Sequence, residues 1–139
     1  MNPLYLIDTN LCIDVSRRQN ARLSLRLAGH SFGTVAMSVV TLGELRVGAE
    51  RSARRLDGHR IIEDLLELIP AVALPEAAAG HYGEIRAHLA RIGQIIGNND
   101  LWIGAHARAL GATIATSNVR EFVRIPGLRV EDWAAPDAG

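Results

Sequence analysis

Residues 4–10 read Leu4-Tyr5-Leu6-Ile7-Asp8-Thr9-Asn10, and this stretch decides the fold. The apolar run 4–7 is short, which is typical of a buried strand. Asp, Thr and Asn follow it directly, and these residue types cap the N-termini of helices. We therefore expect a strand that leads at once into a helix over about residues 11–16. A strand followed directly by a helix is the first unit of an α/β chain.

The alternation of strand and helix continues along the rest of the chain. Apolar spacing and turn residues predict further helices over residues 22–28, 41–55, 61–69, 76–92 and 98–110. Further strands are predicted over residues 34–40, 72–74, 112–116 and 128–130. The helix at 41 begins with a capping box, Thr41 to Glu44, and Asp57-Gly58 ends it. Strands separated by helices pair in parallel through right-handed crossovers, so we expect a three-layer α/β/α sandwich.

Length and composition limit the possible classes of protein. The chain has 139 residues, so we expect one domain spanning 1–139. All 15 basic residues are arginine, which excludes mechanisms that need a lysine, such as those of P-loop NTPases and kinases. A single cysteine, Cys12, cannot form an internal disulfide and favours a reducing, cytoplasmic location. We see neither a signal peptide nor an apolar stretch of about 18 residues, so we expect no membrane association.

The charge is unevenly distributed although it sums to zero. Residues 17–60 hold nine arginines against three acids, and residues 61–139 hold six arginines against ten acids. A basic half suits an anionic partner. Two groups of arginines have helical spacing and would either follow RNA phosphates or form solvated helix faces: Arg18, Arg22 and Arg26, and Arg51, Arg54 and Arg55.

Carboxylates and amides fall where strands end or helices begin. Asp8 follows the first strand, Glu44 lies in the first turn after the second, and Asp100 opens the helix before the strand 112–116. Asn118 and Glu121 follow that strand. Because an open parallel sheet binds ligands at the carboxyl ends of its strands, we expect these five residues to meet there.

Several carboxylates at one edge repel one another unless their pKa values rise or a cation binds. Oxygen ligands suit Mg²⁺ or Mn²⁺, and the chemistry that follows is metal-assisted hydrolysis of phosphodiesters. Each residue also has a purely local interpretation. Asp8 and Glu44 would cap helices, Asp100 would favour a helix dipole, Asn118 would form a turn, and Glu121 would pair with a neighbouring arginine.

Four segments in this order resemble the PIN-domain ribonucleases of the VapC type, the toxins of bacterial type II toxin–antitoxin pairs. The segments are Leu6-Ile7-Asp8-Thr9-Asn10, Ser38-Val39-Val40-Thr41-Leu42-Gly43-Glu44-Leu45-Arg46-Val47-Gly48-Ala49, Asn99-Asp100 with Trp102-Ile103-Gly104-Ala105-His106-Ala107, and Thr116-Ser117-Asn118 with Arg120-Glu121-Phe122 and Ile125-Pro126-Gly127-Leu128. Together they cover essentially the whole chain.

The resemblance implies a central five-stranded parallel sheet, a homodimer, and a structured RNA such as tRNA as substrate. It implies Mg²⁺ or Mn²⁺ held by Asp8 and Asp100, with Glu44 completing the site through a water. Many relatives have an acid where this chain has Asn118, and Glu121, one helical turn further on, is the candidate replacement. The implied inhibitor is a cognate VapB-like antitoxin that reaches the acids with an arginine or lysine.

Two other functions are open at this stage. A phosphatase of the haloacid-dehalogenase kind also opens with a strand and an aspartate, but it needs a second aspartate where this chain has Asn10, and usually a lysine. A non-catalytic PIN scaffold that only binds a protein would not need its acids. Cleavage of RNA with Mg²⁺, and its loss with EDTA, separates all three.

Overall fold

The computed structural model of this protein describes residues 2–134, in which five strands alternate with seven helices. The strands are β1 (Tyr5–Ile7), β2 (Val35–Ser38), β3 (Ala71–Val72), β4 (Thr113–Thr116) and β5 (Val130–Asp132). The helices are α1 (Thr9–Arg17), α2 (Ala21–Ala28), α3 (Val39–Arg51), α4 (Arg55–Leu68), α5 (Ala77–Arg91), α6 (Asn98–Leu110) and α7 (Val119–Phe122).

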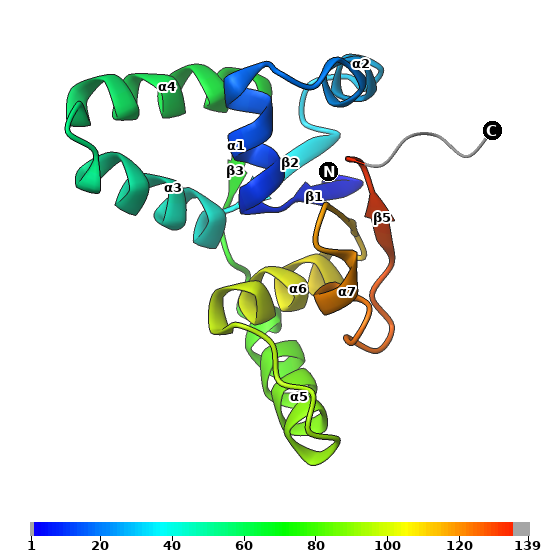
Figure 1. The fold of residues 1–139 in the computed structure, drawn as a ribbon. Helices are drawn as coiled ribbons and strands as arrows, with labels where there is room; N and C mark the ends of the chain where they lie inside the picture. The colour runs from blue at the N-terminus through cyan, green and yellow to red at the C-terminus, as the bar shows by residue number, and fades with distance from the viewer. Residues whose placement is uncertain (1, 135–139) are drawn as a thin grey trace.

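The strands form one parallel sheet in the order β3-β2-β1-β4-β5 (Figure 1). The strand β1 is central, pairing with β2 through Leu6 and Ala36 and with β4 through Leu6 and Ile114. The chain adds β2 and β3 on one side of β1 and then returns to add β4 and β5 on the other. The carboxyl ends of β2, β1 and β4 therefore lie side by side, where this change of direction opens a ligand site.

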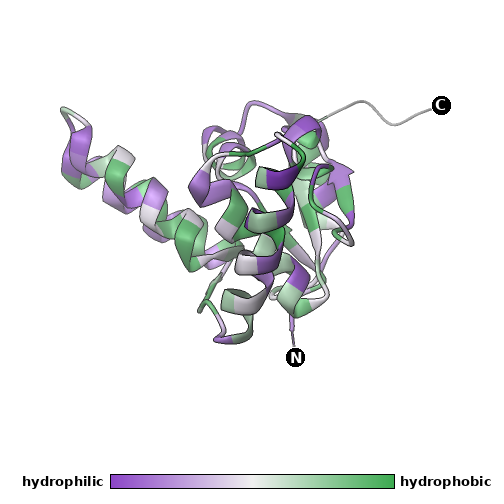
Figure 2. Cartoon of the chain, turned by 90° about the horizontal axis from the view of Figure 1, so that it is seen from below, coloured by the Kyte–Doolittle hydropathy of each residue, from purple (hydrophilic) through white to green (hydrophobic). Residues whose placement is uncertain are grey.

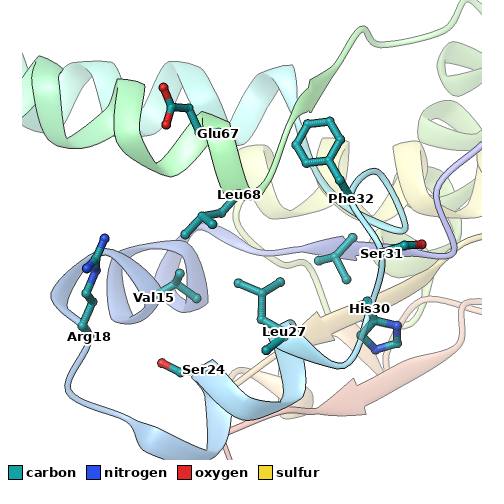
Figure 3. Close-up of a pocket in the computed structure, with 11 residues that line it drawn as sticks. Val15, Arg18, Ser24, Leu27, His30, Ser31, Phe32, Glu67 and Leu68 are labelled. Carbon is teal, nitrogen blue, oxygen red and sulfur yellow. The ribbon is translucent and has the colours of Figure 1, made fainter.

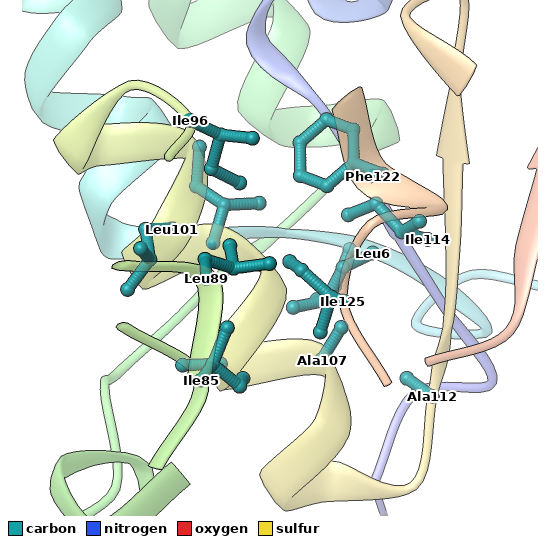
Figure 4. Close-up of a cluster of buried hydrophobic side chains, with 13 residues drawn as sticks. Leu6, Ile85, Leu89, Ile96, Leu101, Ala107, Ala112, Ile114, Phe122 and Ile125 are labelled. Atoms are coloured by element: carbon teal, nitrogen blue, oxygen red, sulfur yellow. The ribbon is translucent and has the colours of Figure 1, made fainter. Parts of the chain in front are cut away.

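Alternate residues of the central strand belong to two separate cores. Leu6 packs with side chains of α5, α6 and α7, such as Leu89 and Phe122 (Figure 4). Ile7 packs on the opposite face with α1, α2 and α4, through residues such as Leu11 and Leu65. Helices on both faces of a parallel sheet confirm the predicted three-layer α/β/α sandwich with five strands.

Helices α3 and α4 form an arm that projects from the rest of the molecule (Figures 1 and 2). Polar bonds join the two helices, since Arg46 donates to Glu63 at 2.6 Å and contacts Nδ1 of His59 at 3.1 Å. Of the residues of α3, Thr41 and Ala49 are the buried ones. The apolar side chains of Val40, Leu42 and Leu45 are partly buried against the two cores, so apolar and polar contacts together position this helix.

Two predicted boundaries in this region are wrong. The second strand ends at Ser38, whose side chain accepts a hydrogen bond from the backbone N–H of Val40 and caps α3. Thr41 therefore does not begin the helix, and the capping box from Thr41 to Glu44 does not exist. The β-branched pair at 39–40 favoured strand in the sequence, but the cap two residues earlier outweighs that local preference.

The predicted break at Asp57-Gly58 is also wrong, because α4 runs through both residues. The backbone of Gly58 approaches Ala49 so closely that an added Cβ would lie 3.1 Å from the Ala49 Cα. This glycine therefore serves helix packing, and the turn lies earlier, between Arg51 and Arg55.

The two expected arginine groups do not lie on single helices. In the first group, Arg18 ends α1 in a left-handed conformation, with a φ of 54°, while the other two members lie on α2. In the second group, α3 ends at Arg51 and α4 begins at Arg55. Neither group forms the continuous stripe that helical spacing predicted.

Gly104 on α6 allows the loop after α7 to pack closely. A Cβ at this position would overlap Ile125 Cδ1, which lies in the buried core. We expect Gly104→Ala to lower the free energy of unfolding by about 1–2 kcal/mol, because overpacking outweighs the gain in helix propensity. The matched control is Gly83→Ala on α5, where a Cβ would meet nothing within 4 Å. It should raise that free energy by about 0.5–1 kcal/mol in urea denaturation. Equal effects of the two substitutions would contradict this account of packing.

None of the helices within residues 2–134 combines the length and the apolar character that crossing a bilayer requires.

Candidate active site

The carboxyl ends of β1, β2 and β4 bring the predicted site residues to one edge of the sheet. Asp8 directly follows β1, and Glu44 lies on α3, which follows β2. Asp100 lies in the first turn of α6, and Asn118 precedes α7 while Glu121 lies within it, after β4. The fold therefore gathers residues that are spread over most of the chain.

Asp8 is held on both of its carboxylate oxygens. Its side chain is 3% exposed, and Oδ1 accepts a hydrogen bond from the backbone N–H of Leu11 at 3.0 Å. The Thr116 hydroxyl donates to Oδ2. Burial raises the pKa of Asp8 above its ordinary value, and the two hydrogen bonds oppose that rise. The local interpretation is also correct, because Asp8 caps α1.

Thr9 fixes Glu44. The Thr9 hydroxyl donates to Glu44 Oε1 at 2.6 Å, so this carboxylate is directed towards the end of β1 and not back along its own helix. This bond joins two residues that are far apart in sequence. Glu44 therefore binds Thr9 and does not cap the N-terminus of its own helix, as the predicted capping box required.

Asp100 and Glu121 form a carboxyl pair that shares a hydrogen bond. Burial, that hydrogen bond and the negative charges of Glu121, Glu44 and Asp8 raise the pKa of Asp100 to about 7. Four carboxylates are therefore within electrostatic reach of one another. Glu121 belongs to the cluster and not to a surface pair with a neighbouring arginine.

The Asn118 backbone N–H donates to the Thr116 hydroxyl oxygen at 2.7 Å. The same hydroxyl donates to Asp8, so Thr116 joins the end of β4 to the first acid. The Asn118 side chain makes no capping hydrogen bond to α7. Its amide is therefore available to the site.

Sequence reasoning missed two hydroxyl residues that hold the acids in place, Thr9 and Thr116. Both lie inside motifs that the sequence analysis singled out, next to Asp8 and two residues before Asn118. Proximity to a predicted acid was the available signal. The partner of each hydroxyl, however, lies on another element and becomes visible only in the fold.

The donor set fits a hard divalent cation. Every charged group in the cluster is a carboxylate, and burial together with the weaker repulsion between these groups raises the pKa of Asp8 and of Asp100. Bound positive charge would relieve that repulsion. Within residues 2–134, no three His, Cys, Asp or Glu side chains are grouped closely enough to hold an ion by themselves. Mg²⁺ usually takes one or two carboxylates and completes its shell with waters and substrate phosphate.

A cavity of about 330 Å³ opens beside the acids, lined by Glu44, Gly97, Asn98, Asn99 and Asp100. A larger one of about 410 Å³ lies on the α1, α2 and α4 side and is mainly apolar (Figure 3). Its lining includes Leu27, Phe32 and Leu68, and none of the five predicted site residues. Chemistry at the acids and binding of an apolar group would therefore occur at separate places.

The fourth position of the cluster can be assigned by mutation. Glu121→Gln is expected to lower the rate of RNA cleavage at least about tenfold, since the Glu121 carboxylate interacts with Asp100 and adds negative charge to the cluster. Asn118→Asp should be tolerated, because it replaces the amide with a further carboxylate at the sheet edge that already carries the other carboxylates. Rates are compared with melting temperatures, which should change little. A silent Glu121→Gln together with an inactive Asn118→Ala would assign this position to the asparagine.

Comparisons with known proteins agree with this geometry. Residues 5–128 match the family described as PIN domain. The chain is 41% identical to the tRNA(fMet)-specific endonuclease VapC of Shigella flexneri, over 94% of this chain and 98% of that protein. It is 36% identical to Ribonuclease VapC2 of Haemophilus influenzae, over 93% and 97%.

Solved structures give the same result. The VapBC complex of Salmonella typhimurium bound to DNA contains a chain that superposes with a TM-score of 0.89 at 35% identity, covering 96% of this chain and 99% of that one. A chain of VapBC2 from Rickettsia felis, also bound to DNA, gives a TM-score of 0.83 at 32% identity, covering 93% and 98%. The chain therefore belongs to the PIN-domain family and, within it, to the VapC ribonucleases.

Proposed function

We propose that this protein is a metal-dependent endoribonuclease and the toxin of a toxin–antitoxin pair, with a structured RNA such as a tRNA as its substrate. The observation that carries the proposal is the cluster of Asp8, Glu44, Asp100 and Glu121 at one sheet edge, where the pKa of Asp100 rises to about 7. A purely structural edge gains nothing from four carboxylates that repel one another. The relative from Shigella flexneri is named for its action on tRNA(fMet).

Each residue has a role in this proposal. Asp8 and Asp100 would hold Mg²⁺ or Mn²⁺, and a bound ion would activate water and neutralise negative charge on the phosphoryl oxygens. Glu44, fixed by Thr9, would orient the attacking water as a hydrogen-bond acceptor. Glu121 would add negative charge beside Asp100 and reach the ion through a water, and Asn118 would donate hydrogen bonds from its side-chain amide.

The direct test incubates the purified protein with tRNA and with unstructured RNA, in Mg²⁺ and then in excess EDTA. We expect internal cleavage in Mg²⁺, none in EDTA, and recovery when Mn²⁺ is added. Cleavage that persists in EDTA would contradict the metal. Inertness in both ions, in a protein that still binds an antitoxin, would favour the non-catalytic PIN scaffold.

A VapB-like antitoxin is the proposed partner, because the solved relatives are VapBC complexes. The apolar cavity of Figure 3 would take apolar side chains of the antitoxin, and an arginine or lysine of the antitoxin would reach the acids. We expect purified cognate antitoxin to stop cleavage without degrading the toxin, because its cation competes with the metal. Unimpaired cleavage in a saturated complex would contradict this. The homodimer implied by the resemblance stays a prediction, which light scattering tests.

A further inference from the structure

A fully buried polar pair joins α3 to α6. His106 and Ser38 both have 0% exposure, and His106 Nδ1 lies 2.8 Å from Ser38 Oγ. Ser38 Oγ already accepts a hydrogen bond from the Val40 N–H, so its own proton is free to be donated to Nδ1. The imidazole is then neutral with its proton on Nε2, in agreement with the burial that lowers the pKa of His106.

The histidine is costly to bury. Its Nε2 has no hydrogen-bond partner among the described residues, and an interaction with the backbone of Ala73 only partly opposes the effect of burial on the pKa of His106. An imidazole of which one nitrogen lacks a partner is less favourable in a core than an apolar side chain of similar size. An apolar side chain at position 106 could not form the hydrogen bond to Ser38, so this bond is what the histidine contributes there.

The pair and the acids occupy matching positions on the two helices. Ser38 caps α3, and Glu44 lies six residues further on, about 9 Å along the helix axis. His106 lies six residues after Asp100 on α6, again about 9 Å. Glu44 and Asp100 line the same cavity, so the two helices run in opposite directions between the buried pair and the acids (Figure 1).

We infer that the Ser38–His106 hydrogen bond sets the separation of Glu44 from Asp100, and that both of its members are positioning residues of the active site. Repulsion between the carboxylates acts to separate α3 from α6, and the apolar side chains of α3 that resist this separation, Val40, Leu42 and Leu45, are only partly buried. The buried bond provides that resistance at the other end of the helix pair. The inference rests on the proposed function where it is tested by the rate of RNA cleavage. Metal binding gives a second measurement that does not depend on cleavage.

The test uses the full chain with Ser38→Ala, His106→Phe and the double variant. Metal half-saturation is read from the rise in melting temperature with Mn²⁺, and kcat and KM from RNA cleavage. We expect each single variant to raise metal half-saturation about fivefold and to lower kcat at least about tenfold, with a smaller change in KM. The double variant should be no worse than the worse single one, since both remove the same bond.

Controls separate positioning from stability. Ile85→Val removes one methyl group from the core beneath α6 and lies outside the pair, so it supplies a stability loss without the broken bond. His106→Asn keeps a side-chain oxygen near the place of Nδ1 and should recover part of kcat. Ser38→Ala also removes the cap of α3. If His106→Phe does not fold, the test is carried by the recovery of kcat in His106→Asn relative to His106→Ala, since both keep that cap.

The inference is overturned if the Ser38 and His106 variants match Ile85→Val in kcat and in metal half-saturation at equal stability. Failure of the proposed function looks different, because the wild-type protein itself would then neither bind Mn²⁺ nor cleave RNA. A wild-type protein that binds Mn²⁺ without cleaving RNA leaves half-saturation as the deciding measurement.

Discussion

Asp100→Asn is expected to reduce RNA cleavage at least about a thousandfold while making the metal-free protein more stable. The substitution keeps the size of the side chain but removes one ligand charge and one source of repulsion. Asp8→Asn should have a similar effect on the rate. Cleavage by either variant at near the wild-type rate would show that the metal site is assigned to the wrong residues.

The stability gain from Asp100→Asn has a definite dependence on pH. The pKa of Asp100 is about 7 in the folded protein and near 3.8 in the unfolded chain. The unfolded state therefore loses this proton first, so stability falls as pH rises from about 4 to 7 and the full cost is present above 7. The side chain is partly exposed, and solvent screening reduces that cost to about 1 kcal/mol.

Melting curves of metal-free protein at pH 6 and pH 8 measure this effect. The wild-type protein should lose stability between the two values, and Asp100→Asn should lose less. The control is Asp64→Asn, an exposed acid of α4 outside the cluster, which should keep the wild-type dependence. An Asp100→Asn variant that follows the wild-type curve would contradict the raised pKa.

The second large effect, on metal affinity and cleavage rate, is expected for Thr116→Val, a substitution that acts through Asp8. Its hydroxyl donates to Asp8 Oδ2 and accepts from the Asn118 N–H. Valine has nearly the same shape but removes one of the two hydrogen-bond donors of a buried carboxylate, so the pKa of Asp8 rises further. We expect metal affinity and cleavage rate to fall about 10- to 100-fold, as for other groups that orient metal ligands.

The acidic limb of the pH–rate profile should also move to higher pH in Thr116→Val, because Asp8 must be ionised to bind a cation. Thr116→Ser keeps the hydroxyl and serves as the control, with a profile close to that of the wild-type protein. A valine variant with an unchanged profile would mean that the Thr116 hydroxyl does not support Asp8.

Much of the fold could be predicted because its signals are local. The apolar run before Asp8 and the spacing of apolar residues over 76–92 each give an element within a residue or two of its observed bounds. The boundary between β2 and α3 could not be found in this way. Strand preference at Val39 and Val40 competes there with capping by Ser38, and the cap outweighs that preference.

The candidate site was predictable to the same extent. Acids that follow strands meet at one sheet edge once the strands are known to be parallel, which places Asp8, Glu44 and Asp100 together. Hydroxyl residues such as Thr9 and Thr116 are common in every sequence. Their function depends on partners from distant parts of the chain, so no local pattern distinguishes them.

The position of β1 between β2 and β4 has a consequence for biosynthesis. A ribosome delivers β1 first and β4 almost last, and the contact between Asp8 and Thr116 spans 108 residues. A growing chain that ends before residue 113 can pair β1 with β2 but leaves the other edge of β1 open, without Thr116 at Asp8 or Glu121 at Asp100. Such a chain lacks Glu121, one of the four carboxylates of the cluster, and the Thr116 hydroxyl that holds Asp8. Nuclease activity would therefore arise only near the end of translation. An unfinished chain that is still attached to its ribosome would not yet be an active nuclease.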